Sequence, residues 1–380
     1  MKYTDEYRDP ATAQRLISEI LAQAAVPRRS NRVQGSASGI RIMEFCGGHT
    51  HAIMRYGLRQ VLAPRVVMTS GPGCPVCVTA DADIDYCIAL AHLPGVMVAT
   101  FGDMIRVPGT RSSLQEARAA GASVHIVYSA LDALELARKE PQRAVVMLGI
   151  GFETTAPTVA ASLVQARDEG IGNYTVYCMH KLTPPAMRGI LDSGEVRVDA
   201  ILGPGHVTAI TGWRAWEFLP QEYGIPCAVS GFEPLDMLQA VRVLVQAVVQ
   251  GNPHVANAYP RGVTAEGNRV AQGLMEQVFQ VSPALWRGLG EIPASGLSLR
   301  PEYAAYDARL AFSVPAELLD LKPSEMHRGC HCSEVLRGMM EPPECPLFRR
   351  VCTPAQPIGP CMVSAEGACA AHYRYGETLS

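Results

Sequence analysis

Short runs of β-type residues alternate with helical segments along most of the chain, and this alternation limits the fold more than any other feature of the sequence. Alternation of strand and helix is typical of parallel sheets covered by helices. The predicted strands are residues 40–44, 66–69, 96–100, 123–126, 144–150, 175–177, 200–202 and 227–229. Predicted helices fall between many of them, at residues 80–91, 113–120, 130–139, 157–169, 184–193 and 235–250. The sequence therefore predicts an α/β fold.

The length of the chain indicates more than one domain, because 380 residues are too many for one ordinary core. The repeated pattern of strand, glycine turn and helix predicts two Rossmann-like domains with parallel sheets, at residues 40–135 and 136–253. Residues 1–39 are expected to form an N-terminal helix and a linker. Strand signals fade from residue 254, so residues 254–380 are predicted to form a separate Cys-rich region of loops and helices.

Most of the predicted strands end in a turn that is rich in glycine or proline and carries polar residues. These turns lie at residues 46–51, 70–74, 101–103, 151–155, 203–206 and 230–234. Because ligands of open α/β sheets bind at the carboxyl ends of the strands, we expect the functional residues in these turns. None of the turns matches the glycine patterns of dinucleotide or phosphate loops, so the sequence gives little support to a nucleotide site.

The charge balance argues against some classes of partner. The 33 basic and 36 acidic residues give a formal net charge of -3, which is no electrostatic reason to expect nucleic acid or an anionic membrane. The N-terminus has no apolar segment of the kind found in signal peptides. No apolar run reaches the roughly 18 residues that cross a bilayer. We therefore expect a cytoplasmic protein without a membrane or nucleic-acid partner.

The 12 cysteines of the chain are informative in such a compartment. Structural disulfides are rare where thiols are kept reduced, so clustered cysteines indicate metal ligation or thiol chemistry. Half of the cysteines lie between Cys330 and Cys369, and two more form the C-x-x-C motif of Cys74 and Cys77. The remaining cysteines among apolar residues are expected to be buried small hydrophobic side chains: Cys87, Cys178 and Cys227.

The C-terminal cysteines are spaced as single residues, and the candidate ligands of one site are Cys332, Cys345, Cys352 and Cys369. Zinc sites usually take their thiolates in close C-x2–4-C pairs, which are absent here. Widely spaced cysteines on loops suit the larger [4Fe–4S] cube. Structural zinc, or reduced cysteines without metal, are the alternatives. Cys330 and Cys361 are then spare thiols, and the role left for them is a second redox pair.

A cysteine and two histidines share the turn after the first predicted strand. Cys46, His49 and His51 follow one another closely, and the glycines at positions 47 and 48 let the backbone bend so that the thiol points outward. Thiolate and imidazole at this density can bind a transition metal. A cysteine that only packs within the loop is also compatible with the sequence, so the residues alone leave both interpretations open.

The C-x-x-C motif opens a predicted helix after the second predicted strand. At a helix N-terminus this spacing lowers the pKa of the first thiol and favours reversible disulfide chemistry between Cys74 and Cys77. The alternative is a four-ligand zinc site that combines these two cysteines with Cys46 and His49.

Glu153 lies in the turn before a helix that is predicted to begin near Pro157. It could serve a site at the strand end, or it could cap that helix together with its threonine neighbours. His206 occupies a comparable turn after a later strand, where a hydrogen-bonded loop histidine is an equally good interpretation.

Taken together, these motifs resemble those of the HypD family. Residues 43–51, 70–77, 151–157 and 203–206 are similar to successive family signatures, and the tail from Cys332 to Cys369 resembles the cluster-binding end of the family. The likeness runs from about residue 40 to residue 375. It implies two α/β domains, a cluster-binding region that holds a [4Fe–4S] cluster on the four cysteines given above, and complexes with the small maturation protein HypC and with HypE.

The resemblance also implies a function in the maturation of [NiFe]-hydrogenases. Together with HypC, the protein would hold an iron atom that carries cyanide and carbon monoxide, the Fe(CN)2CO group. Cys46 matches the iron-associated thiol of the family, and His49 and His51 are close enough in sequence to supply a ligand or a supporting hydrogen bond. Cys74 and Cys77 match its redox pair, toward which electrons would pass from the cluster.

Two other functions fit parts of the sequence. The first is a thiol–disulfide oxidoreductase that acts on protein substrates through Cys74 and Cys77. The second is an interaction protein stabilised by zinc. A broad visible absorption would exclude the zinc protein, and iron bound to Cys46 in a complex with HypC would exclude the oxidoreductase.

Overall fold

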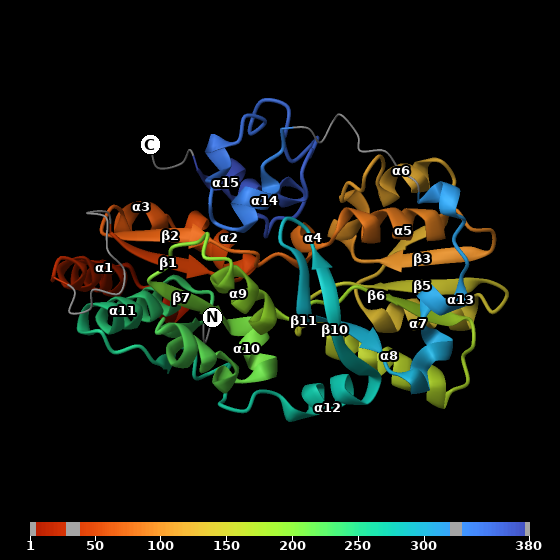
Figure 1. The fold of residues 1–380 in the computed structure, drawn as a ribbon, viewed down its shortest axis with the longest axis horizontal. Coiled ribbons are helices and arrows are strands. Elements are labelled where there is room, and N and C mark those ends of the chain that lie inside the picture. The colour runs from red at the N-terminus through yellow and green to blue at the C-terminus, as the bar shows by residue number, and fades with distance from the viewer. Residues whose placement is uncertain (1–4, 28–38, 320–328, 377–380) are drawn as a thin grey trace.

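The computed structural model describes residues 5–27, 39–319 and 329–376. They form two α/β lobes side by side, and a C-terminal module packs on the first lobe (Figure 1). Each lobe is built on one parallel sheet, as the alternation of strands and helices predicts. No helix among the described residues combines the length and the apolar character needed to cross a membrane.

The sheet of the first lobe has five parallel strands in the order β2-β1-β7-β8-β9. Strand β1 lies near the middle and pairs Ile40 with Val66 on one side and Ile42 with Ala200 on the other. The bounds of these strands are Ile40–Glu44 for β1, Val66–Ser70 for β2, Ala200–Pro204 for β7, Cys227–Ser230 for β8 and Val255–Asn257 for β9.

The sheet of the second lobe has four parallel strands in the order β4-β3-β5-β6. All residues of β3 are buried, because helices cover both faces of the sheet, and its sequence is accordingly a continuous apolar run. The bounds are Val96–Thr100 for β3, Val124–Ile126 for β4, Ala144–Gly149 for β5 and Tyr174–Cys178 for β6.

The expected boundary between two domains at residue 135 is wrong, because it falls within one sheet. Strands β3 and β4 before that position and β5 and β6 after it belong to the same sheet. The first lobe instead combines strands from before residue 71 with strands from after residue 199, because β1 pairs with both β2 and β7. Strand periodicity reports which residues form a strand, but it does not report which distant strand becomes the neighbour.

Helices cover both sheets, and several begin at residues that the sequence marks as caps. For example, Ser129 accepts the backbone N–H of Leu131 and forms a capping box with Asp132. The helices of the first lobe are α1 (Pro10–Ala24), α2 (Gly47–Arg55), α3 (Leu58–Leu62), α4 (Pro75–Val78), α9 (Thr183–Asp192), α10 (Gly205–Thr211) and α11 (Pro234–Gln250). Those around the second lobe are α5 (Asp81–Ala91), α6 (Leu114–Ala119), α7 (Ala130–Lys139), α8 (Ala156–Asp168), α12 (Arg269–Val278) and α13 (Ala308–Ala311).

An antiparallel hairpin lies between the two lobes, where the sequence predicts no strands (Figure 1). Its strands are β10 (Phe279–Trp286) and β11 (Gly290–Leu299). The expectation that strands end near residue 254 is therefore wrong. Strand β10 exposes much of its length and contains Pro283, so it lacks the apolar run that makes a buried strand visible in a sequence.

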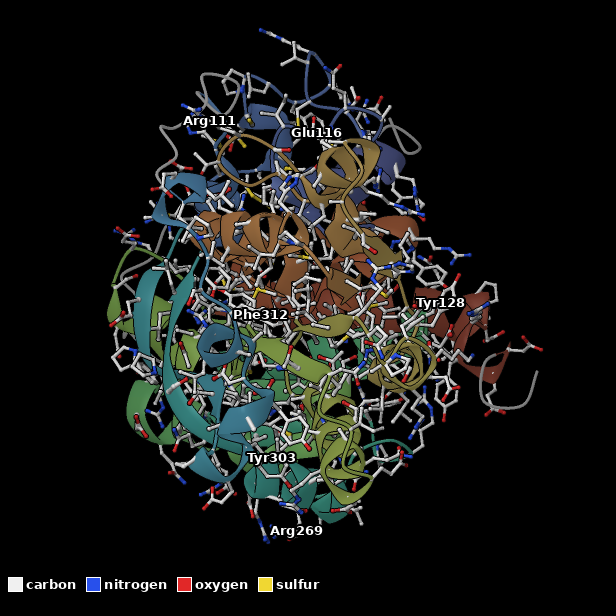
Figure 2. All side chains as sticks on the ribbon, turned by 90° about the vertical axis from the view of Figure 1, so that its right-hand side faces the viewer. Arg111, Glu116, Tyr128, Arg269, Tyr303 and Phe312 are labelled. Atoms are coloured by element: carbon white, nitrogen blue, oxygen red, sulfur yellow. A yellow bond between two sulfur atoms is a disulfide. The ribbon has the colours of Figure 1, made fainter. Side chains whose placement is uncertain are left out.

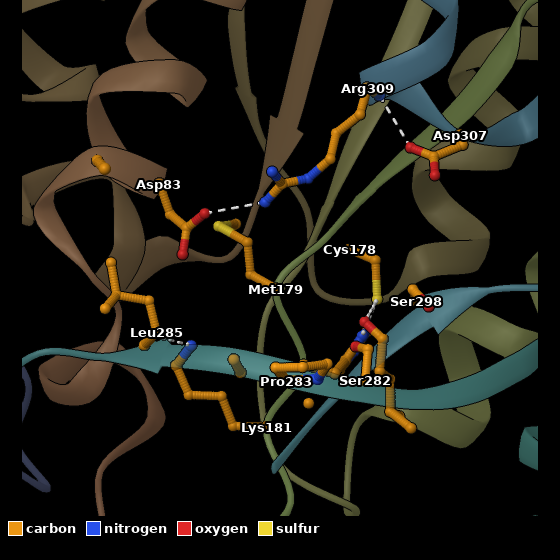
Figure 3. Close-up of a pocket in the computed structure, with 15 residues that line it drawn as sticks. Asp83, Cys178, Met179, Lys181, Ser282, Pro283, Leu285, Ser298, Asp307 and Arg309 are labelled. Atoms are coloured by element: carbon orange, nitrogen blue, oxygen red, sulfur yellow. Dashed lines mark hydrogen bonds and ion pairs between the residues drawn. The ribbon is translucent and has the colours of Figure 1, made fainter. Parts of the chain in front are cut away.

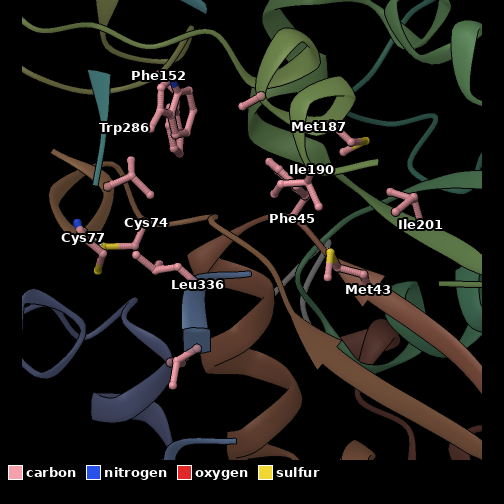
Figure 4. Close-up of a cluster of buried hydrophobic side chains, with 14 of the residues drawn as sticks. Met43, Phe45, Cys74, Cys77, Phe152, Met187, Ile190, Ile201, Trp286 and Leu336 are labelled. Atoms are coloured by element: carbon pink, nitrogen blue, oxygen red, sulfur yellow. Dashed lines mark hydrogen bonds between the residues drawn. A yellow bond between two sulfur atoms is a disulfide. The ribbon is translucent and has the colours of Figure 1, made fainter. Parts of the chain in front are cut away.

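The C-terminal module consists of loops and short helices, as expected. Its helices are α14 (Cys332–Leu336) and α15 (Ala368–Tyr375), with 3-10 turns at Pro342–Glu344 and Pro360–Met362. Helix α15 contacts α2, and the turn at Pro360–Met362 contacts α4. Leu336 and Met362 share one buried cluster with Met43 and Phe45 of the first lobe (Figure 4). The module thus covers the carboxyl ends of β1 and β2.

Candidate functional site

The turns after β1 and β2 meet at one edge of the first sheet. The backbone N–H of Gly47 donates to the Gly73 carbonyl at 3.0 Å. A Cβ atom on Gly73 would lie 2.4 Å from the Cys46 nitrogen, so only glycine permits this approach. The parallel pairing of β1 and β2 therefore brings Cys46 next to the C-x-x-C motif at the carboxyl ends of these two strands.

Cys46 is half-buried at the N-terminus of α2. Its backbone N–H donates to Glu44 Oε2 at 2.9 Å. Burial, together with the nearby carboxylates of Glu366 and Glu44, raises the pKa of the Cys46 thiol to about 12. The thiol is therefore protonated at neutral pH when nothing is bound to it.

Glu44, the last residue of β1, stabilises this turn by hydrogen bonds, although the sequence did not predict a role for it. It is 1% exposed and also accepts a hydrogen bond from the Thr50 hydroxyl. Burial raises the pKa of the Glu44 carboxyl to about 7. An acidic residue at the end of an otherwise apolar strand was the signal that could have identified it.

His49 is a buried neutral imidazole on the turn that carries Cys46. Its Nε2 lies 3.0 Å from the Gly231 carbonyl, and burial lowers its pKa to about 4. Among the described side chains, none makes a hydrogen bond with its Nδ1. The ring stacks on Phe232 at 4.7 Å, and the exposed ring of His206 stacks on Phe232 at 3.9 Å. Turns after β1, β7 and β8 thus converge here, and they bring His206, which the sequence left without a clear role, close to His49.

His51 lies on the other side of α2 from His49 and faces the C-terminal module. Its Nε2 lies 3.2 Å from the Tyr375 hydroxyl, and its Nδ1 lies 3.4 Å from the Ala365 carbonyl. The two rings also meet edge to face. These contacts hold α2 against α15, so His51 and His49 have different surroundings despite their closeness in sequence.

Cys74 and Cys77 form a disulfide at the start of α4 (Figure 4). Both are buried, with exposed fractions of 3% and 0%, and Phe152, Trp286 and Leu336 belong to the same apolar cluster. No group of three or more His, Cys, Asp or Glu side chains in the described part of the chain is arranged to hold one metal ion. The alternative zinc site with Cys46 and His49 is not formed in this state, because both cysteines of the C-x-x-C motif are joined in a disulfide.

A second disulfide joins Cys332 and Cys361 in the C-terminal module. Cys77 Sγ lies 3.7 Å from the carbonyl oxygen of Pro360, the residue that precedes Cys361. The two disulfides are thus neighbours across the contact between α4 and the module. The expected spare pair, Cys330 with Cys361, is replaced by the pair of Cys332 with Cys361.

One small pocket is lined by all the cysteines of the module. Its other lining side chains are apolar, for example Leu347, Phe348 and Met362, with the exception of His331. The free thiols around it are Cys330, Cys345, Cys352 and Cys369. This set differs from the expected ligands in one position, because the disulfide occupies Cys332 and leaves Cys330 free. Four thiols around an apolar pocket fit a cluster with several metal atoms better than a single ion.

Glu153 stabilises a different helix from the one expected. Its two carboxylate oxygens accept the backbone N–H and the hydroxyl of Thr183, each at 2.8 Å, at the start of α9. Helix α8, which follows Glu153 in sequence, is preceded by Thr155 without a side-chain cap. Glu153 is 3% exposed, and burial raises its pKa to about 7.

Glu366 is a further residue of the site that no local pattern in the sequence identifies. A Cβ atom on Gly47 would lie 2.5 Å from the Glu366 Cβ, so the module rests directly on the turn that carries Cys46. Nearby, the Ser364 hydroxyl donates to Asp103 of the second lobe at 2.8 Å. All three parts of the structure therefore meet beside Cys46.

Comparison with known proteins gives the family of the chain. A family model described as "HypD: Hydrogenase formation hypA family" matches residues 21–376. The hydrogenase maturation factor HypD of Rhizobium leguminosarum bv. viciae is 47% identical, over 99% of this chain and 96% of that protein. HypD of Rhodobacter capsulatus is 45% identical over 99% and 98%. HypD of Escherichia coli is 43% identical over the full length of both chains. The chain therefore belongs to the HypD family.

Proposed function

We propose that this chain is a scaffold for assembly of the Fe(CN)2CO group of [NiFe]-hydrogenases, in complexes with HypC and HypE. The relatives named as hydrogenase maturation factors support the general role. The observation that carries the finer role is a succession of sulfur sites. It leads from the pocket of free cysteines through two neighbouring disulfides to the single thiol of Cys46.

We assign Cys46 as the ligand from this chain that holds the iron atom during assembly. Thiolate is a soft ligand and suits iron that carries cyanide and carbon monoxide. Because the free thiol is protonated, iron binding must displace its proton. Without iron, Cys46 is therefore a weakly reactive thiol and not a thiolate. A Cβ atom on Gly48 would lie 2.9 Å from the Phe232 ring and 3.7 Å from Cys46 Sγ, so this glycine lets the ring approach the turn that carries Cys46. A ligand from HypC could complete the iron site.

The pocket of the C-terminal module is the place that we assign to a [4Fe–4S] cluster. Cys330, Cys345, Cys352 and Cys369 would hold it, and when bound it supplies electrons one at a time. The mostly apolar lining of the pocket would limit the access of water to the four sulfur atoms.

The two disulfides are the route that we propose for electrons. Two electrons from an external one-electron carrier, together with two protons, convert the Cys332–Cys361 disulfide into two thiols. One of them attacks the Cys74–Cys77 disulfide as a thiolate and forms a mixed disulfide, which its partner then resolves. The Cys332–Cys361 disulfide forms again, and Cys74 and Cys77 are left as two thiols beside Cys46.

The alternative function, thiol exchange with protein substrates, is disfavoured by burial. An exchange site for proteins needs an accessible thiol with a lowered pKa. Cys74 and Cys77 are covered by the C-terminal module and by apolar side chains of the first lobe. Another protein could not reach their sulfur atoms without displacing that module, whereas the second disulfide already lies next to them.

The decisive experiment replaces Cys46 with serine in the protein purified without oxygen together with HypC. We expect Cys46→Ser to keep the fold and the cluster iron, but to lose the infrared stretches of cyanide and carbon monoxide and all hydrogenase maturation. Cys227→Ala is the matched control, because Cys227 is a buried thiol of β8 without a disulfide. Infrared bands that persist in Cys46→Ser would remove the basis of the scaffold role.

A further inference from the structure

A pocket of about 380 Å³ lies at the second lobe, on the side of the hairpin (Figure 3). The turn after β6, both hairpin strands and the starts of α5 and α13 contribute to its wall. Its size is in the range of small-molecule sites. Its position at the carboxyl end of a parallel strand is where α/β sheets bind ligands. None of the cysteines assigned above to iron or electron transfer lines it.

Two acidic residues and an arginine of this pocket satisfy one another. Arg309 forms an ion pair with Asp83 at 3.0 Å, and Asp83 also accepts the Tyr177 hydroxyl at 3.0 Å. Asp307 accepts the backbone N–H of Arg309 at 2.8 Å, at the N-terminus of α13. The guanidinium group of Arg309 is thus paired with Asp83, and the Asp307 carboxylate caps the N-terminus of α13.

Lys181 is a cationic side chain of the pocket wall that forms no ion pair within the described part of the chain. Its side chain is 2% exposed, and its Nζ donates to the Leu285 carbonyl at 2.9 Å and lies 5.7 Å from the Trp286 ring. No carboxylate of the described residues forms an ion pair with it. Burial lowers the pKa of Lys181, and the carboxylate of Asp83 offsets only part of this effect. Buried charges in proteins are normally paired.

His180 supplies a second unused polar group at the same wall. It is 1% exposed, and its Nδ1 lies 3.5 Å from Cys178 Sγ. Its Nε2 is buried without a partner among the described residues. Buried polar groups usually find a hydrogen-bonding partner. The adjacent side chains of Lys181 and His180 therefore both indicate that a polar group of a ligand binds here.

We propose that this pocket binds a small monocarboxylate whose carboxylate group pairs with the ammonium group of Lys181. The short carbon chain of the ligand packs against Pro283, Leu285 and Leu297, which supply the apolar part of the wall. The two carboxylates that face the same space repel anions with two or more charges. The ligand class is therefore a monoanion of metabolite size, and this site is independent of the proposed iron scaffold.

The test measures binding of acetate and pyruvate to the full-length protein. Thermal unfolding in either sodium salt, compared with sodium chloride at equal ionic strength, should give a Tm that rises with carboxylate concentration. Saturation transfer from the protein to the ligand methyl group in NMR should report direct contact. The absence of both effects up to millimolar concentrations, or stabilisation by inorganic phosphate but not by carboxylates, would overturn the proposal.

Three variants test whether the carboxylate-dependent rise in Tm depends on Lys181. Lys181→Met should lose the carboxylate-dependent rise in Tm, yet unfold at a higher temperature than the wild type in chloride, because a buried unpaired charge is removed. Lys139→Met, which changes an exposed lysine of α7, should behave as the wild type. Ser298→Leu fills the pocket and should abolish binding while Lys181 is kept. A carboxylate effect that is equal in all variants would place the ligand elsewhere and refute this site.

Discussion

Three side chains at the strand ends have pKa values that burial moves away from their ordinary range. Burial raises the pKa of Cys46 to about 12 and of Glu153 to about 7, and it lowers the pKa of His49 to about 4. In each case the neutral form is the one that the fold favours. At the residue scale, burial therefore favours the uncharged forms of these three groups.

Glu153→Gln should reveal the cost of the buried carboxyl as a function of pH. The folded protein keeps a proton on Glu153 up to a pKa of about 7, whereas the unfolded chain releases it near the ordinary glutamate pKa of 4.5. The wild type therefore loses stability as pH rises through this window. The stability of Glu153→Gln relative to the wild type should increase between those limits, by up to ~3 kcal/mol. Urea unfolding at several pH values checks this, and a constant difference would contradict it.

The ligands of the proposed cluster can be tested by replacing two neighbouring cysteines with alanine, one at a time. Cys330→Ala should lose most of the iron of protein purified without oxygen, because it removes one of four thiols around the pocket. Cys332→Ala should keep about four iron atoms per chain, since Cys332 belongs to the disulfide. Iron analysis and visible absorption distinguish the two variants. The reverse result would restore the set inferred from the sequence, with Cys332 as a ligand.

At the scale of elements, the close approach of two turns forms the site. Strands β1 and β2 run parallel in register, so the turns that follow them leave the sheet side by side. Gly73 packs against the backbone of Cys46, and Gly47 packs against Glu366 of the module. These contacts bring two short helices, α2 and α4, to begin next to each other and under the module.

Gly73→Ala should force these turns apart. The added methyl group would lie 2.4 Å from backbone atoms of Cys46, which cannot move aside as a flexible side chain can. Overpacking of this kind costs about 1–3 kcal/mol, and we expect lost maturation as well. Gly172→Ala is the control, because nothing lies within 4 Å of the added atom. Denaturant unfolding of both variants checks the prediction, and equal stabilities would show that the contact relaxes easily.

At the scale of the whole molecule, the C-terminal module is part of the core and not an appendage. Val335, Leu336 and Met362 share one buried cluster with residues of the first lobe and with Trp286 of the hairpin. Arg106 of the second lobe donates to the carbonyls of Pro354 and Val363, at 3.2 Å and 3.0 Å. The module thus connects both lobes, and its loss would expose apolar surface on each side of the contact.

Leu336→Ala should therefore destabilise the entire protein. The side chain is 3% exposed, and large-to-small changes at such positions cost about 2–5 kcal/mol. We expect a lower Tm, with circular dichroism of the lobes and visible absorption of the cluster changing in one transition. Leu310→Ala, at a side chain that is 71% exposed, should leave the Tm nearly unchanged. Separate transitions for the lobes and the cluster would mean that the module folds independently.

The sequence by itself determined the α/β class, most strand positions, the strand-end turns and the family, because periodicity and local motifs are properties of neighbouring residues. Tertiary structure decided which strands pair, and so corrected the boundary at residue 135, since the β1–β7 partnership links residues far apart in the chain. It also decided that Cys332 and not Cys330 joins a disulfide, because two cysteines separated by one residue can face different neighbours. Glu366 reached the site, and Glu153 capped α9, through contacts that arise only when the chain is packed.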